Sequence, residues 1–307
     1  MTALPFTKMH GLGNDYVYVD GFVHQVEDPA ALARQVSDRH RGIGSDGLIL
    51  VMPPEPDAGA HVRMRMFNAD GSESEMCGNG VRCVCKFAID RGLAGANPLR
   101  VQTGRGVLSL DWRLGPDDQV DSVRVDMGAP ILPSARIPAR VDGLDPAAAA
   151  VGHAGLARTL RDTVGDVGWG AIEPVATLVS MGNPHLVLWC PSVASIELDV
   201  IGPLLERHEA FPSRINVHVV EVIDPGQVRM RTWERGSGIT QACGTGACAV
   251  AVAGVLEGRT RHAVQAALPG GMLSLEWGGG ASSVFMTGPA TTVFEGIWQP
   301  SGAVVGS

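Results

Sequence analysis

Short runs of apolar and β-branched residues, separated by turn-forming residues, are the dominant pattern along the chain. Runs of this kind, bounded by Gly, Pro, Asn or Asp, are typical of β-strands. They predict strands over residues 47–51, 62–67, 123–127, 176–180, 216–222 and 228–233. Helical patterns are fewer, so we expect an α/β (α+β) fold in which strands outnumber helices.

Two segments have a helical pattern instead. Apolar residues recur on one helical face from Gly80 to Ala88, and Gly92 closes that segment. Residues 247–256 are small and apolar all round, and Gly258 follows them. Because a helix without a polar face must be buried, we expect each helix to lie at the centre of a sheet.

Three features of the first half of the chain recur in the second half at a nearly constant separation. A Cys-Gly-x-Gly turn precedes each predicted helix, a Gly-Asn pair precedes an apolar run, and a polar residue stands nine positions before each cysteine. Such a repeat indicates a duplicated chain. The matched residues are Cys77 and Cys243, Asn14 and Asn183, and Asn68 and Glu234.

The duplication predicts two pseudo-symmetric lobes, each with a mixed, barrel-like sheet around a central helix. The chain becomes rich in Pro and Gly near residues 127–130, where we place the boundary. The N-terminal lobe would span residues 1–130, with a C-terminal strand in 290–307 returning to it, and the other lobe 131–289. Residues 142–170 have no counterpart and are interpreted as a surface insertion with a short Ala-rich helix. We expect the active site in the cleft between the lobes.

The position of the two cysteines suggests acid–base chemistry. A helix N-terminus carries unpaired N–H groups and a partial positive charge, which lowers the pKa of a thiol and attracts an anion. Inverting a stereocentre needs a base on one face and an acid on the other, and two facing lobes can supply both. We therefore expect Cys77 and Cys243 to form the acid/base pair of an amino-acid epimerase.

Composition narrows the alternatives. The formal net charge is −8, no basic tract occurs, and no run of 18 apolar residues occurs, so we expect neither nucleic-acid binding nor a membrane span. The N-terminus does not resemble a signal peptide, which predicts a cytoplasmic protein. Lys8 and Lys86 are the only lysines, and neither lies in a glycine-rich phosphate site, which argues against pyridoxal phosphate.

The remaining cysteines and arginines receive plainer interpretations. No Cys-x-x-Cys pair occurs, so we expect no metal site. The other four cysteines are expected to be small buried residues, and the scattered arginines, such as Arg39 and Arg41, solvated surface residues. The four cysteines are Cys83, Cys85, Cys190 and Cys248.

Several motifs resemble those of the diaminopimelate epimerase family. The segment N-A-D-G-S-E at 68–73, followed by C-G-N-G at 77–80, resembles the first active-site motif of that family. The segment W-E-R-G-S-G at 233–238, followed by A-C-G-T-G at 242–246, resembles the second. The segments K-M-H-G-L-G-N-D at 8–15 and G-N-P-H at 182–185 also fit. The resemblance extends from about residue 6 to residue 298.

The resemblance implies interconversion of LL- and meso-diaminopimelate by a homodimer, without pyridoxal phosphate or metal, in lysine and peptidoglycan precursor synthesis. It implies that His185 and Glu234 tune the thiol pKa values. The α-carboxylate would be held at the two helix ends by Gly78, Asn79, Gly244 and Thr245. The other substrate-binding residues that it implies are Asn14, Asn68, Asn183, Asn216, Glu234 and Arg235.

One position departs from the family pattern, and alternatives stay open. Many members carry a substrate-contacting Gln where this chain has Gly47. The asparagines could serve only to stabilise tight turns, and His185 could be a hydrogen-bonded residue beside one. Other functions would be a proline or hydroxyproline racemase, a non-catalytic amino-acid-binding protein, or a phenazine-type isomerase relative. The last group lacks the cysteine pair, and the racemases usually have His in place of Asn79.

Overall fold

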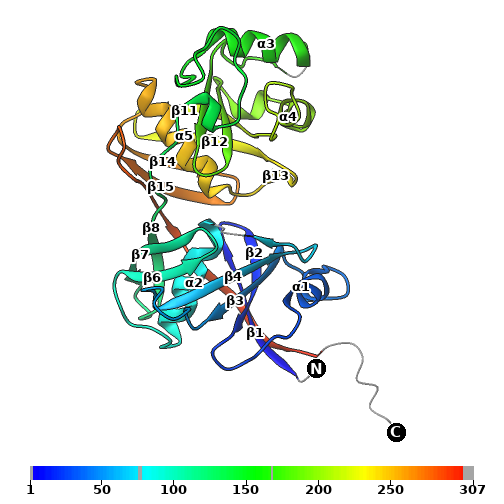
Figure 1. The fold of residues 1–307 in the computed structure, drawn as a ribbon, viewed down its shortest axis with the longest axis vertical. Coiled ribbons are helices and arrows are strands. Elements are labelled where there is room, and N and C mark those ends of the chain that lie inside the picture. The colour runs from blue at the N-terminus through cyan, green and yellow to red at the C-terminus, as the bar shows by residue number, and fades with distance from the viewer. Residues whose placement is uncertain (1–2, 75–77, 167–168, 300–307) are drawn as a thin grey trace. The chain divides into compact units, whose positions relative to one another are not determined.

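The computed structural model describes residues 3–74, 78–166 and 169–299. These divide into two compact units, one from residues before 126 together with those from 288 on, and the other from residues 126–287. The duplicated arrangement of sheet and helix that we predicted from the sequence is present in each unit (Figure 1).

The first unit is a mixed sheet with two helices. Its helices are α1 (Pro29–Ser37) and α2 (Gly78–Asp90). Its strands are β1 (Leu4–Gly11), β2 (Asn14–Asp20), β3 (Gly47–Met52), β4 (Val62–Asn68), β5 (Glu73–Ser74), β6 (Leu99–Thr103), β7 (Gly106–Leu114), β8 (Val120–Asp126) and β17 (Thr291–Trp298). The C-terminal strand β17 pairs antiparallel with β1.

The second unit repeats this order and adds a helix. Its helices are α3 (Ala154–Val164), α4 (Leu198–Glu206) and α5 (Gly244–Leu256), with short 3₁₀ turns at Ser134–Arg136 and Val193–Ser195. Its strands are β9 (Ala176–Ser180), β10 (Pro184–Trp189), β11 (Asn216–Asp224), β12 (Gln227–Glu234), β13 (Gly238–Thr240), β14 (Ala263–Leu268), β15 (Gly271–Trp277) and β16 (Val284–Pro289).

Strand pairing is the same in both units. In the first, β1–β2 is antiparallel, β2–β3 parallel, β3–β4 antiparallel and β4–β6 parallel. In the second, β9–β10, β10–β11, β11–β12 and β12–β14 follow that same sequence of directions. The register places Asn14 with Asn183, Gly47 with Asn216, and Asn68 with Glu234 as equivalent residues.

The central helices have the burial that their sequences predict. Helix α2 packs against β1–β4, β6 and β7, and α5 packs against β9–β11, β14 and β15. All of α5 from Gly246 to Gly254 is buried, because its small apolar residues cover the whole circumference. Gly92 and Gly258 follow the two helices with positive φ angles of 69° and 67°, which glycine adopts readily.

The prediction that residues 142–170 form a surface insertion is wrong for the side of this segment that packs against the rest of the second unit. Helix α3 begins after His153, whose Nδ1 accepts a hydrogen bond from the Leu156 N–H at 2.9 Å. Leu156 and Leu160 join a hydrophobic core cluster of the second unit together with Trp169. The alanine run at 147–150 is not helical. The insertion therefore adds core to its unit rather than only covering it.

Candidate active site

Cys243 is the N-cap residue of α5 and is only 4% exposed. Its carbonyl accepts the first helical hydrogen bond, from the Ala247 N–H at 2.9 Å. The thiol therefore lies at the N-terminus of a buried helix, as the glycine-rich turn predicted. Its counterpart Cys77 lies outside the described residues.

The prediction that the helix end lowers the thiol pKa is wrong for Cys243. Burial raises the pKa of Cys243 well above its usual value, and the nearby negative charge of Glu234 raises it further. The Thr245 hydroxyl and the Gly246 N–H act in the opposite direction, with smaller effects on this pKa. Cys243 is therefore a protonated thiol in this structure, suited to act as an acid.

A chain of hydrogen bonds leads from Cys243 into the core of the second unit. Cys243 Sγ lies 3.7 Å from Thr245 Oγ1, and Asn183 Nδ2 donates to Thr245 Oγ1 at 3.3 Å. The Asn183 Oδ1 atom lies 3.0 Å from His185 Nε2, and His185 Nδ1 lies 2.9 Å from His218 Nε2. His218 Nδ1 lies 2.9 Å from the hydroxyl of Thr232.

Both histidines in this chain of hydrogen bonds, His185 and His218, are fully buried. Burial lowers the pKa of His185 well below its usual value, and the neighbouring His218 and Arg235 lower it further. Burial alone lowers the pKa of His218 to about 3. The pair is therefore neutral, and each ring offers one donor and one acceptor. His185 was a sequence candidate, whereas His218 was not.

Gly246 allows Cys243 and His218 to approach each other. A Cβ atom at position 246 would lie 2.2 Å from His218 Cε1 and 3.0 Å from Cys243 Sγ. Real Cβ atoms do not come this close to other atoms, so any side chain here would displace the ring or the sulfur. The second glycine of the Cys-Gly-Thr-Gly turn is thus needed for space.

Asn216 and Arg235 connect the strand ends around the thiol. Asn216 is 3% exposed, and its Nδ2 donates to the Pro184 carbonyl at 2.8 Å while its Oδ1 accepts from the Arg235 N–H at 2.9 Å. The Arg235 side chain is exposed, and its Nη1 donates to the Ser213 carbonyl at 2.9 Å. Asn216 therefore braces the backbone around the proposed substrate residues.

A buried carboxylate supports the loop that carries Glu234 and Arg235. Glu206 is 3% exposed, and it accepts hydrogen bonds from Trp233 Nε1 at 2.7 Å and from the Gly236 N–H at 3.2 Å. These two residues flank Glu234 and Arg235 in the sequence. Glu234 itself accepts from the Thr240 hydroxyl at 2.6 Å, which fixes its carboxylate.

The equivalent residues of the first unit occupy turns and a helix end. Asn14 begins β2, opposite Gly11. Asn68 donates from Nδ2 to the Ser72 hydroxyl at 2.9 Å, which gives it the turn-stabilising role that we had left open. Asn79 is 2% exposed at the start of α2, and its Oδ1 accepts from Arg82 Nη2 at 3.1 Å.

Arg82 departs from the expectation that the arginines lie on the surface. It is fully buried and donates to the Gly78 carbonyl at 3.2 Å and to the Pro289 carbonyl at 3.1 Å, as well as to Asn79. A buried guanidinium needs such a full set of acceptors. Arg82 therefore holds the glycine-rich turn at the start of α2.

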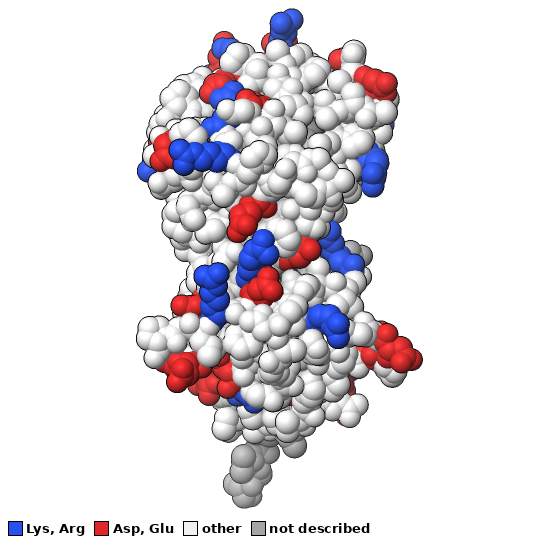
Figure 2. Space-filling view, turned by 90° about the vertical axis from the view of Figure 1, so that its left-hand side faces the viewer, with Lys and Arg blue, Asp and Glu red and all other residues white. Residues whose placement is uncertain are grey.

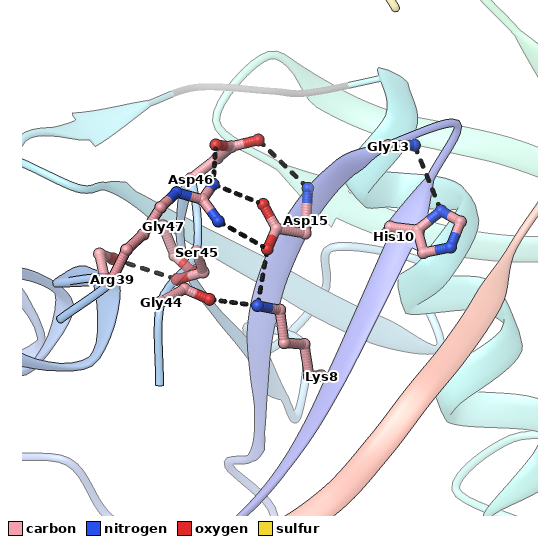
Figure 3. A network of polar contacts seen from close by, with 10 residues as sticks. Lys8, His10, Gly13, Asp15, Arg39, Gly44, Ser45, Asp46 and Gly47 are labelled. Atoms are coloured by element: carbon pink, nitrogen blue, oxygen red, sulfur yellow. Dashed lines mark hydrogen bonds and ion pairs between the residues drawn. The ribbon is translucent and has the colours of Figure 1, made fainter. Parts of the chain in front are cut away.

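An ion-pair network holds the turn that contains Asn14 (Figure 3). Asp15 lies 2.7 Å from Lys8 Nζ and 2.9 Å from Arg39 Nη2, and Arg39 also lies 2.9 Å from Asp46. The Asp15 N–H donates to Asp46 Oδ2 at 3.1 Å. Arg39 is half exposed but has defined partners, so the network ties the start of β2 to the loop before β3.

Both lysines are committed to structural contacts. Lys8 pairs with Asp15, and Lys86 is buried, donating to the Val120 carbonyl at 2.8 Å and pairing with Asp90 at 2.8 Å. Each of the two lysines thus has an ion-pair partner within the described residues.

Four further features of the described residues concern metal ligands, helix length, surface charge and the other cysteines. No group of three or more His, Cys, Asp or Glu side chains within residues 3–74, 78–166 and 169–299 is placed to hold a metal ion. Among the described helices, none is long and apolar enough to cross a membrane. On the face shown in Figure 2, acidic and basic side chains are interspersed. The four remaining cysteines are buried, as predicted.

His218, Thr232, Glu206 and Arg82 are the residues that sequence reasoning missed. One signal was available for His218, because it stands two residues after Asn216 on a predicted strand and so shares its face. Glu206 and Arg82 gave no such signal, since charged residues in helices are usually solvated. Their partners come from distant parts of the sequence.

A sequence profile of the family described as diaminopimelate epimerase matches residues 6–133 and 177–293. The gap in this match contains the insertion at 142–170. The chain is 50% identical over 296 residues to the diaminopimelate epimerase of Desulforudis audaxviator, which covers 96% of this chain and 99% of that protein. It is 46% identical over 293 residues to that of Methanococcus maripaludis strain C6, covering 95% and 99%.

Solved structures at low identity show a related fold. A PhzF-family phenazine biosynthesis protein of Bacillus anthracis matches with a TM-score of 0.68 and 17% identity, over 98% of this chain and 100% of that chain. A hydroxyproline epimerase from Agrobacterium vitis matches with a TM-score of 0.62 and 15% identity, over 97% of this chain and 91% of that chain. These matches extend over both units.

Proposed function

The chain belongs to the diaminopimelate epimerase family, and from this premise we propose that it interconverts LL- and meso-diaminopimelate without pyridoxal phosphate or metal. The observation that carries the proposal is the buried thiol of Cys243 at the N-terminus of α5, in a Cys-Gly-x-Gly turn that the chain repeats at Cys77. The product would serve lysine and peptidoglycan precursor synthesis.

The raised pKa of Cys243 supports a role for this thiol as the acid in one direction of the reaction. Because burial and Glu234 keep this thiol protonated, Cys243 is the acid and Cys77 is the base when the cycle begins from this state. The Cys77 thiolate takes the α-proton from one face, and Cys243 donates its proton to the opposite face of the α-carbon. The cycle ends with Cys77 as thiol and Cys243 as thiolate, ready for the reverse reaction.

Backbone N–H groups at the helix ends stabilise the charge on the substrate. The first N–H groups of an α-helix have no acceptor within the helix, so we propose that Gly244 and Thr245, at the start of α5, bind the α-carboxylate beside Cys243. Gly78 and Asn79 have the same role at the start of α2. A fixed set of donors stabilises the carbanion that forms when the α-proton leaves.

The remaining substrate contacts surround this carboxylate site. We propose that the cleft between the lobes brings the two helix ends to one substrate, with His185 and Glu234 beside the thiols. Arg235 is well suited to read the distal amino-acid end, because its guanidinium is exposed and is anchored by a hydrogen bond from Nη1 to the Ser213 carbonyl. The asparagines that complete the site are Asn14, Asn68, Asn183 and Asn216.

Solvent exchange tests this function directly. The protein is incubated with LL-diaminopimelate in D₂O, and NMR follows the α-proton while chiral chromatography follows the meso isomer. Epimerisation with deuterium incorporation at one α-carbon is the expected result. Absence of both label and meso product would exclude the function and favour a non-catalytic binding protein. Inversion of L-proline or trans-4-hydroxy-L-proline in parallel incubations would instead favour a racemase for those substrates.

Two further properties implied by the family stay predictions. We expect a homodimer, which light scattering coupled to size-exclusion chromatography measures directly. We also expect a cytoplasmic location, which fractionation of the producing cells tests.

A further inference from the structure

We propose that His218 and Thr232 are positioning residues that orient the Thr245 hydroxyl so that it donates a hydrogen bond to Cys243 Sγ. They do so through His185 and Asn183, which lie between them in one continuous chain of hydrogen bonds. The catalytic role of His218 and Thr232 rests on the proposed function, whereas the donor-to-acceptor direction of the hydrogen bonds does not.

The strands explain why these residues meet. His218 on β11 stands directly opposite Thr232 on β12, and β10 runs parallel to β11 with His185 opposite Asn216. His218 is two residues further along β11, on the face that Asn216 occupies, so its ring reaches back to His185. All three side chains are at most 2% exposed, which leaves them dependent on one another for hydrogen bonds.

The hydrogen bonds of Asn183 determine which atom donates and which accepts at every step of the hydrogen-bond chain. Asn183 donates from Nδ2 to Thr245, so its Oδ1 can only accept, and His185 Nε2 must carry the proton. Since both histidines are neutral, His185 Nδ1 is an acceptor and takes its hydrogen bond from His218 Nε2. His218 Nδ1 is then an acceptor as well, and Thr232 donates its hydroxyl proton to it.

This orientation of the hydrogen bonds affects the thiol of Cys243. The Thr245 oxygen already accepts from Asn183, so its single hydroxyl proton is available for Cys243 Sγ at 3.7 Å. A donor aimed at sulfur stabilises the thiolate more than the thiol. The hydrogen bond from Thr245 therefore lowers the pKa of Cys243, whereas burial and Glu234 raise it. This lowering matters in the half of the cycle in which Cys243 is a thiolate. Arg235 is a charged group near His185, and its positive charge lowers the pKa of that histidine.

Nitrogen NMR on protein labelled with ¹⁵N-histidine tests the orientation without any substrate. We expect His185 and His218 both to be Nε2–H tautomers, and neither to titrate between pH 5.5 and 9. An Nδ1–H tautomer in either ring, or a ring that titrates in this range, would overturn the assignment. Because this measurement does not involve turnover, it stands even if the proposed function fails.

Kinetics of four variants test the role in catalysis. His218→Met removes the donor to His185, and we expect kcat to fall about tenfold with KM close to wild type. In the direction of the reaction in which Cys243 is the base, the pH at which kcat reaches half its maximum on the acid side should also rise. His218→Gln supplies an amide donor and should recover most of kcat. Thr232→Val should repeat the loss and Thr232→Ser should rescue it, which keeps the test valid if His218→Met fails to fold.

The control is His208, a third buried histidine of the same unit, which contacts Thr163 rather than the hydrogen-bond chain. His208→Gln should leave the pH profile of kcat unchanged. Wild-type kcat in His218→Met or Thr232→Val, or equal losses in the Gln and Met variants of His218, would show that the chain does not position Thr245. If the wild-type protein itself does not epimerise diaminopimelate, the proposed function fails and the NMR result alone decides the orientation.

Discussion

Gly47 and Asn216 occupy equivalent strand positions in the two units, but only Asn216 has room for a side chain. Each begins a strand that pairs in parallel with the strand after a Gly-Asn turn, Gly47 opposite Tyr16 and Asn216 opposite His185. A Cβ atom on Gly47 would lie 2.1 Å from the Phe67 carbonyl oxygen and 3.1 Å from Tyr16 Cε1. The backbone here thus excludes the Gln that many family members carry.

Restoring that Gln should destabilise the protein. In Gly47→Gln, the new Cβ must displace the β4 backbone, and we expect a loss of about 2–4 kcal/mol in the free energy of unfolding, measured by urea denaturation. Gly95→Ala is a matched control, because nothing lies within 4 Å of its Cβ position and its φ is not positive. Equal stability of the two variants would show that the strand adjusts at little cost.

The cysteine pair should be indispensable for inversion. Cys243→Ala and Cys77→Ala each remove one of the two proton carriers, so epimerisation should fall at least about 100-fold in either variant. Cys248→Ala, at a buried position in the same helix α5, is the control and should retain turnover. Wild-type turnover in either of the first two variants would rule out the two-thiol mechanism.

The charge of Glu234 should be visible in the reactivity of Cys243. Glu234→Gln keeps an acceptor for Thr240 but removes the negative charge, so the pKa of Cys243 should fall. Iodoacetamide labelling at several pH values, with the Cys243 peptide followed by mass spectrometry, should show alkylation beginning at lower pH than in wild type. Glu221→Gln is the control, because Glu221 raises the pKa of Cys190 and not that of Cys243. An unchanged profile in Glu234→Gln would mean that burial alone keeps the thiol protonated.

The buried histidine pair predicts a loss of stability in acid. Both pKa values are lowered by folding, so below pH about 6.5 the unfolded chain binds protons that the folded chain does not. The free energy of unfolding should therefore decrease as pH falls from 7 to 5, with a slope that approaches about 1.4 kcal/mol per pH unit for each histidine once the pH is well below 6.5. His218→Gln should reduce the slope of unfolding free energy against pH by the contribution of one histidine. A slope equal to that of wild type would show that His218 is protonated in the folded protein.

The sequence alone determined much of the fold. Alternating and continuous apolar runs record which faces are buried, so the strands at 176–180 and 216–222 and both central helices could be placed within a few residues. The repeat of Cys-Gly-x-Gly gave the duplication, because equivalent units keep equivalent turns. Even the position of Cys243 at a helix start followed from its glycines.

Only the tertiary structure decided the protonation of Cys243 and the partners of His185. A helix end lowers a thiol pKa, but complete burial and a neighbouring carboxylate raise it, and their balance depends on which residues surround the sulfur. The hydrogen-bond chain joins positions from 183 to 245 through strand register, which local periodicity does not record. Sequence patterns thus identify the reacting group, whereas the packing of distant residues sets its proton affinity.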